Sequence, residues 1–180
     1  EDVQVAPSNV PYLWLKTKQA SLFIKNPSYR VDQIDYESII SKCIEGKAPV
    51  PKGDWKPGKT IDRLVWTDVH VGMDASRKGL ALYAAEWNES ELIKRVKEMA
   101  EFVLANKSSD SLVIDDLGDF MDGWDGETTR KGHKLPQNMT NEEAFESGLK
   151  AKILLIDYLS PQYRNIMCNN ICEDNHSGAF

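Results

Sequence analysis

Short apolar runs alternate with longer amphipathic segments over the second part of the chain. The runs RLVWTDVH (63–70), SLVIDDLGD (111–119) and RNIMCNNICEDNH (164–176) have the length and composition of buried strands. The segments between them, 88–107 and 140–161, have helical periodicity. A chain that alternates strand and helix in this way is expected to form an α/β fold, with helices packed on a sheet and a site at the carboxyl ends of the strands.

Both helical segments carry signals at their starts. Segment 88–107 has one apolar face, formed by Leu92, Val96, Met99 and Val103. Ser90 is its predicted N-cap. Segment 140–161 opens with the spacing of a capping box, from Thr140 to Glu143, and stops before Pro161.

Composition and charge narrow the class of protein. The chain has 180 residues, of which 41% are apolar, and five are Trp, which indicates a globular domain. No run approaches the roughly 18 apolar residues of a membrane span, and the first ten residues lack the layout of a signal peptide. We expect a soluble, cytoplasmic protein. The net charge of -6 disfavours a protein that coats nucleic acid but does not exclude an enzyme that acts on phosphates through metal ions, whose own charge would invert the local field.

The first sixty residues differ from the rest. Segment 11–30 has four basic side chains and no acidic one, with aromatic residues between them. Single-stranded nucleic acid is bound by such combinations, although two amphipathic segments packed on the main domain would have the same composition. Segment 47–59 is rich in Pro and Gly and reads as a linker. The sequence thus predicts an N-terminal arm and linker over 1–60 and a domain over 61–180.

The three cysteines are Cys43, Cys168 and Cys172. An odd number in a chain of this size indicates reduced thiols rather than a disulfide framework. The spacing of CNNIC does not match a zinc knuckle.

An acidic cluster follows the second strand-like run. Its members are Asp115, Asp116, Asp119, Asp122, Asp125 and Glu127. Like charges this close repel one another, so water and lysines or a cation must neutralise them. We expect Asp115, Asp116, Asp125 and Glu127 to form a solvated loop.

Polar side chains stand at the end of each of the three strand-like runs. They are Asp68 and His70, then Asp119 and Asp122, then Asn175 and His176. Residues two apart in a strand point to the same face, so Asp68 and His70 are expected to converge on one ion. Gly118 allows the backbone to turn before Asp119.

The motifs DVH, GDFMD and DNH, in this order, resemble the D-x-H, G-D-x-x-D and G-N-H motifs of the calcineurin-like metallophosphoesterases. The resemblance covers residues 62–180 and implies a sandwich of central mixed sheets flanked by helices. That family ends its site with a later His and a G-H-x-H motif, which are missing, so we expect the domain to be incomplete at its C-terminus. Asp174 replaces the family's usual Gly, and would crowd the turn or supply another carboxylate near the second metal.

The resemblance also implies a role for each motif residue. Asp68 and His70 would bind the first metal, and Asp119 would bridge both metals. Asn175 would bind the second metal. His176 would lie beside the substrate phosphate, stabilising it or protonating the leaving oxygen, and Asp122 would orient the site. Two divalent ions are expected, with Mn favoured and Fe or Zn as alternatives, because oxygen and imidazole ligands suit these metals better than Ca.

The function expected from these features is hydrolysis of a phosphoester by a water activated between two metals. A phosphodiesterase or nuclease is favoured over a monoesterase because segment 11–30 combines basic and aromatic residues. The alternative is a non-catalytic phosphoesterase-like scaffold that binds nucleic acid or a protein partner through this segment. No membrane partner is expected.

Overall fold

The computed structural model describes residues 12–16, 21–25, 34–47, 54–75, 86–124, 126, 135–171, 173–174, 176 and 178–179. The chain divides into two compact units, 1–36 and 37–180. In the first unit, strands β1 (Tyr12–Lys16) and β2 (Ser21–Lys25) form an antiparallel pair. The basic and aromatic side chains of segment 11–30 lie outside the described part of the chain, so their predicted role in binding nucleic acid stays a prediction.

The second unit has the α/β architecture that the sequence predicts. Its elements are α1 (Tyr36–Ile44), β3 (Asp62–Trp66), α2 (Glu89–Ala105), β4 (Ser111–Asp116), α3 (Asn141–Leu159), β5 (Asn165–Asn170), β6 (Glu173–Asp174) and β7 (Gly178–Ala179). No helix in the described part of the chain combines the length and the apolar character needed to span a membrane.

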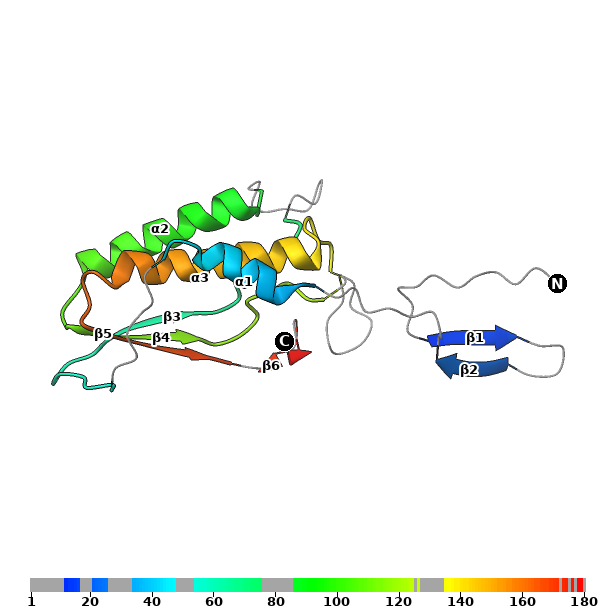
Figure 1. The fold of residues 1–180 in the computed structure, drawn as a ribbon, viewed down its shortest axis with the longest axis horizontal. Coiled ribbons are helices and arrows are strands. Elements are labelled where there is room, and N and C mark those ends of the chain that lie inside the picture. The colour runs from blue at the N-terminus through cyan, green and yellow to red at the C-terminus, as the bar shows by residue number, and fades with distance from the viewer. Residues whose placement is uncertain are drawn as a thin grey trace. The chain divides into compact units, whose positions relative to one another are not determined.

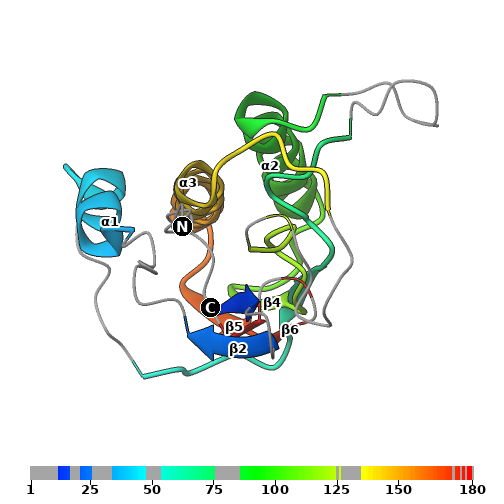
Figure 2. The same ribbon diagram turned by 90° about the vertical axis from the view of Figure 1, so that its right-hand side faces the viewer.

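Strands β3, β4 and β5 form a parallel sheet with β4 in the centre. Figures 1 and 2 show α1, α2 and α3 on the same face of this sheet. Residues Trp66, Asp116 and Asn170 pair across the three strands, so the strands end side by side. Polar residues that follow these ends are therefore delivered to one edge of the sheet. The short strands β6 and β7 form an antiparallel pair after β5.

The hydrophobic core lies between this sheet and helices α2 and α3. Leu112 and Ile114 of β4 are 0% and 4% exposed, and Leu155 and Leu159 of α3 are 1% and 0% exposed. Burying one such side chain stabilises the fold by about 1.5–3 kcal/mol. The apolar face predicted for residues 88–107 is confirmed, because Leu92 and Val96 are buried and Met99 and Val103 pack against them.

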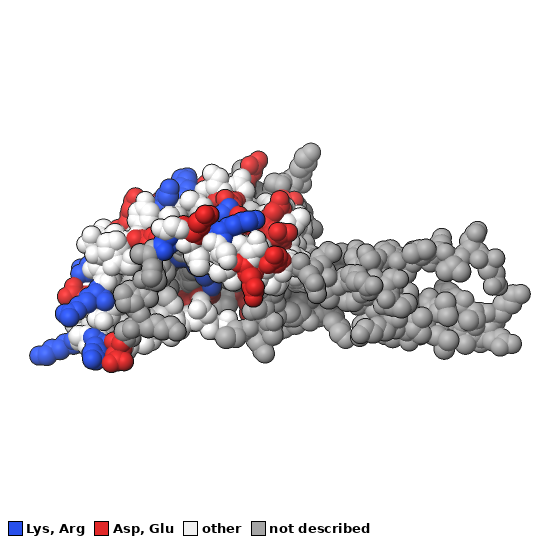
Figure 3. All heavy atoms as spheres, in the orientation of Figure 1, with Lys and Arg blue, Asp and Glu red and all other residues white. Residues whose placement is uncertain are grey.

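Charged side chains cover the outer surfaces of the helices. The Nε atom of Arg95 lies 2.7 Å from Glu91 on α2, and Lys150 of α3 lies 3.2 Å from Glu89 of α2. Figure 3 shows basic and acidic side chains interspersed over the described part of one face. Exposed pairs of this kind contribute roughly 0–1 kcal/mol each, so core packing holds the helices in place.

Asn88 is the N-cap of helix α2, and its side chain accepts a hydrogen bond from the Glu91 amide at 3.0 Å. The prediction that Ser90 caps this helix is wrong. Asn88 has the extended backbone that a cap needs, whereas Ser90 lies inside the first turn. The capping box predicted for α3 is confirmed by reciprocal hydrogen bonds between Thr140 and Glu143.

The carboxylate of Asp62, at the start of β3, binds the segment before β4 and the segment before β5. Asp62 accepts hydrogen bonds from the Ser108 amide at 2.9 Å, the Ser109 amide at 3.1 Å and the Tyr163 hydroxyl at 2.9 Å. Burial raises the pKa of Asp62, but the hydrogen bonds from Ser108, Tyr163 and Ser109 outweigh it and lower that pKa from 3.8 to about 2.

Replacing Asp62 by Ala is therefore expected to lower the free energy of unfolding at pH 7 by about 2–3 kcal/mol, because several donors lose a charged acceptor. A lowered pKa stabilises the folded state above the ordinary value of 3.8, and this contribution is lost as the pH falls towards about 2. Urea unfolding at pH 7 and pH 3 measures both effects. The difference in free energy of unfolding between wild type and Asp62→Ala should be smaller at pH 3 than at pH 7. Asp110→Ala, which removes an exposed carboxylate, serves as control. A difference that is equal at both pH values would contradict this account.

Candidate metal centre

The loops after β3 and β4 run side by side at the carboxyl edge of the sheet. The Asp68 amide donates to the Gly118 carbonyl at 3.2 Å, and the His70 amide donates to the Asp119 carbonyl at 3.0 Å. These hydrogen bonds continue the pairing of β3 with β4 past the ends of both strands. They bring the DVH and GDFMD motifs into contact, as the order of strands predicts.

Asp68, His70 and Asp119 adopt left-handed backbone conformations, with φ of 54°, 49° and 51°. Each such residue costs about 1–2 kcal/mol, so the surrounding contacts must hold it in place. The prediction that Asp68 and His70 converge through strand alternation is wrong, because β3 ends at Trp66 and both residues lie in the loop. The side chains meet nevertheless, with 3.7 Å between His70 Nε2 and Asp68 Oδ1.

Three of the predicted site residues form a compact group of side chains that could hold a metal ion. Ligand atoms of His70, Asp119 and His176 lie within 4.8 Å of one another. The rings of His70 and His176 meet edge to face with their centroids 4.5 Å apart, and His176 Nε2 lies 3.9 Å from Asp119 Oδ2. Two imidazole donors and one carboxylate donor form a ligand set that suits Mn, Fe or Zn.

Asp122 lies between the two histidines and is 3% exposed. Its Oδ1 atom is 3.0 Å from His70 Nδ1 and 3.8 Å from His176 Nδ1. The hydrogen bond to Asp122 raises the pKa of His70, burial opposes this by lowering it, and the charges of Asp122, Asp119 and Asp68 raise it further. Because Nδ1 of His70 is engaged, Nε2 is the nitrogen available to a metal.

Buried polar atoms without hydrogen-bond partners gather at this centre. They are Asp119 Oδ1, Asp122 Oδ2 and His176 Nδ1. A buried carboxylate oxygen without a partner is costly, and a cation removes that cost. The Asp119 oxygen therefore fits a metal ligand. Asp122 and His176 are neighbouring side chains, with 3.8 Å between Asp122 Oδ1 and His176 Nδ1.

The two acidic residues of β4, Asp115 and Asp116, are paired with basic and amide side chains of neighbouring elements. Asp115 lies 3.4 Å from Arg63 and accepts a hydrogen bond from Asn169 at 2.7 Å, while Asp116 accepts one from Lys152 at 2.6 Å. The prediction that these two acids form a solvated loop is wrong, because both are buried within the sheet. Asp125 and Glu127 lie outside the described residues.

The structure places the remaining predicted residues as follows. Asp68 borders the group, with its side chain 62% exposed. The second-metal ligand Asn175 lies outside the described residues, so its role and the second ion stay predictions. Asp174 accepts hydrogen bonds from the amides of Asp119 at 3.0 Å and His176 at 2.9 Å. The sequence signal for this contact is an Asp two residues before a His, a common turn spacing that does not reveal the second partner.

Gly118 has a φ of 99°, and a Cβ atom there would lie 3.1 Å from Asp174 Cβ. Gly46 has a φ of 73° but open space around it. Gly118→Ala is expected to destabilise the fold by about 1 kcal/mol more than Gly46→Ala, because it adds crowding to the strain of a left-handed alanine. Urea unfolding of the two variants compares these costs. Equal losses would show that residues 118 and 174 do not approach this closely.

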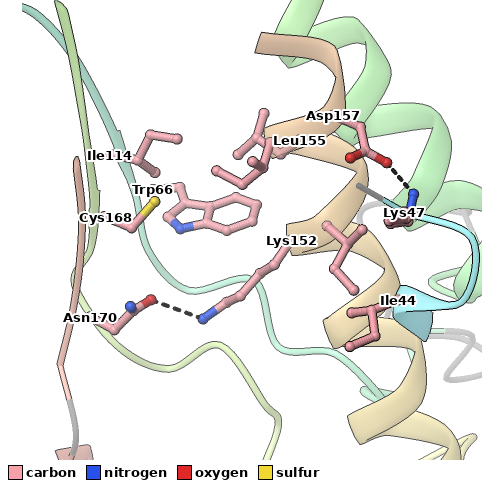
Figure 4. A pocket seen from close by; sticks show the side chains of 11 residues that line it. Ile44, Lys47, Trp66, Ile114, Lys152, Leu155, Asp157, Cys168 and Asn170 are labelled. Carbon is pink, nitrogen blue, oxygen red and sulfur yellow. Dashed lines mark hydrogen bonds and ion pairs between the residues drawn. The ribbon is translucent and has the colours of Figure 1, made fainter. Parts of the chain in front are cut away.

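A cavity of about 500 Å³ lies on the helix side of the sheet (Figure 4). Its walls include Trp66, Ile114, Leu155 and Cys168. Among the described residues that line it, none belongs to the candidate metal group, so this cavity is separate from the site. Lys152 extends beside it to Asn170 at 3.2 Å and anchors α3 to the end of the sheet.

The free cysteines among the described residues are Cys43 and Cys168. Burial raises the pKa of both thiols, and at Cys43 the carboxylate of Glu146 adds to this. A raised pKa favours the protonated form of a thiol, which is the less reactive form.

Comparison with protein-family models finds no match for this chain. Comparisons with curated proteins and with solved structures also find none. The family resemblance therefore rests on the three sequence motifs.

Proposed function

We propose that this protein is a divalent-metal-dependent phosphoester hydrolase of the metallophosphoesterase type. The observation that supports this best is the grouping of His70, Asp119 and His176 at the carboxyl edge of three parallel strands, where Asp119 Oδ1 is buried without a partner. Asp68 and Asp122 each contact His70 beside this group. A cluster of acidic and imidazole groups at this edge, in which the carboxylates outnumber the histidines, is suited to holding cations that attract a phosphate.

In this proposal Asp68, His70 and Asp119 hold one divalent cation. His70 Nε2 lies 3.7 Å from Asp68 Oδ1, a separation that two ligands of one ion can have, and Asp119 contributes its buried oxygen. The cation would supply Lewis acidity and lower the pKa of a coordinated water. Mn²⁺ is the favoured metal. A second ion, held in part by Asn175, belongs to the proposal on the strength of the motif alone.

Asp122 and His176 have the supporting roles. Asp122 fixes the ring of His70 through the 3.0 Å hydrogen bond to Nδ1. The same oxygen, Asp122 Oδ1, lies 3.8 Å from His176 Nδ1, and this approach would direct His176 Nε2 towards the substrate. An imidazole held in this way can stabilise a phosphoryl oxygen or donate a proton to the leaving oxygen.

Hydrolysis of bis(p-nitrophenyl) phosphate and of p-nitrophenyl phosphate tests the proposal. We expect turnover that requires Mn²⁺, stops when a chelator is added and returns with excess Mn²⁺, with the diester as the better substrate. Protein that binds Mn²⁺ but hydrolyses neither compound would favour the non-catalytic scaffold. Protein that is folded and binds no Mn²⁺ would remove the metal centre itself.

A further inference from the structure

We infer that Asp174 is a positioning residue that aligns the two sides of the metal centre. The inference rests on the proposed function, because it takes Asp119 as a metal ligand and His176 as its neighbour at the substrate. Asp174 ends strand β6, whereas Asp119 follows β4. Asp119 and Asp174 are far apart in the sequence, and a hydrogen bond from the Asp119 amide to the Asp174 carboxylate connects them.

The two oxygens of Asp174 accept hydrogen bonds from two different backbone amides. Oδ2 accepts from the Asp119 amide at 3.0 Å, and Oδ1 accepts from the His176 amide at 2.9 Å. Both amides belong to residues whose side chains enter the metal group. The Asp174 side chain therefore fixes the backbone positions of Asp119 and His176, from which their side chains extend into the metal group.

The contact completes a series of hydrogen bonds through the site. The carbonyl of Asp119 accepts from the His70 amide at 3.0 Å, so the backbone of Asp119 is held on both sides. Asp119 has a left-handed φ of 51°, which is costly for a residue other than glycine and persists only where neighbours enforce it. Asp174 and His70 are the neighbours that do so.

The chemistry of this position requires a carboxylate. A carboxylate offers two acceptor oxygens, an asparagine side chain offers one, and alanine offers none. Gly118 permits the approach, because a side chain there would meet Asp174. The Asp that replaces Gly in the third motif thus has a function beyond filling the turn.

The test is a titration with Co²⁺, monitored by visible absorption, of the full 180-residue chain and of its Asp174→Asn and Asp174→Ala variants. We expect the Co²⁺ Kd to rise about tenfold for Asn and about 100-fold for Ala, the range measured when groups that orient metal ligands are removed. We also expect the visible bands at saturating Co²⁺ to change, because displacement of Asp119 alters the coordination geometry. Asp110→Asn, which removes the same charge from an exposed position at the other end of β4, should match wild type.

The other possible results of the Co²⁺ titration distinguish failure of the metal centre from failure of the positioning role of Asp174. A wild-type chain that binds no Co²⁺ would overturn the metal centre and, with it, this inference. Wild-type binding with the same Kd and spectrum in both variants would overturn the positioning role alone, even if the variants melt at lower temperature. A loss of one bound Co²⁺ per chain in the variants would make Asp174 a ligand and also contradict the inference. Circular dichroism of the metal-free variants identifies any that fail to fold, and Asp174→Asn is the milder change.

Discussion

Asp119→Asn is expected to reduce Mn²⁺-dependent hydrolysis of bis(p-nitrophenyl) phosphate by at least about 10³-fold, equivalent to roughly 4 kcal/mol of transition-state stabilisation. The Oδ1 atom of Asp119 is buried without a protein partner, and the residue lies within the group formed with His70 and His176. Asparagine has nearly the same shape but no charge, so the backbone hydrogen bonds to His70 and Asp174 can persist. The loss should therefore concern metal binding rather than folding.

The fold of Asp119→Asn provides the control for this prediction. Removing one of several neighbouring carboxylates relieves repulsion, so the metal-free variant should be at least as stable as wild type in urea. Asp110→Asn again controls for the loss of an exposed charge and should leave turnover unchanged. A variant of Asp119 that retains turnover and Mn²⁺ affinity would exclude this residue as a ligand.

His176→Gln is expected to lower kcat by about 10²–10⁴-fold while the Mn²⁺ Kd changes by no more than about threefold, as for loss of a general acid that is not a ligand. The reason is the position of Asp122, whose Oδ1 atom lies 3.8 Å from His176 Nδ1 and would orient the imidazole towards the substrate. The loss should be larger for a phenyl ester than for a p-nitrophenyl ester, because the poorer leaving group needs the proton more.

Metal affinity distinguishes the two roles that His176 can have. Its ligand atom lies within 4.8 Å of those of His70 and Asp119, which is close enough for all three to bind one ion. A large rise in the Mn²⁺ Kd of His176→Gln, with equal losses for both leaving groups, would make His176 a ligand. Calorimetric titration and steady-state kinetics on the same preparation give both quantities.

The architecture could be predicted from the sequence because its signals are local. The apolar face of residues 88–107, the Thr140 capping box and the alternation of strand and helix each depend on residues close together in the chain. Parallel strands that end side by side then bring polar motifs together without further information. The meeting of His70 and Asp119 follows from that rule, whereas His176 comes after β6, which lies outside the parallel sheet.

The features that the sequence could not predict depend on tertiary contacts. Asp68 and His70 take left-handed conformations because the loop after β4 binds their backbone, a constraint that no local pattern records. Asp115 and Asp116 look like parts of a solvated loop until Arg63, Asn169 and Lys152 are found beside them. The contact of Asp174 with Asp119 likewise spans two strand ends.

We propose that a divalent cation binds between Asp68, His70 and Asp119 at the carboxyl edge of the sheet. Anomalous diffraction from crystals grown with Mn²⁺ tests it most directly. We predict a strong anomalous peak in bonding contact with His70 Nε2 and a carboxylate oxygen of Asp119. Crystals with saturating Mn²⁺ that show no peak there, or show peaks only at other acidic residues, would contradict the account.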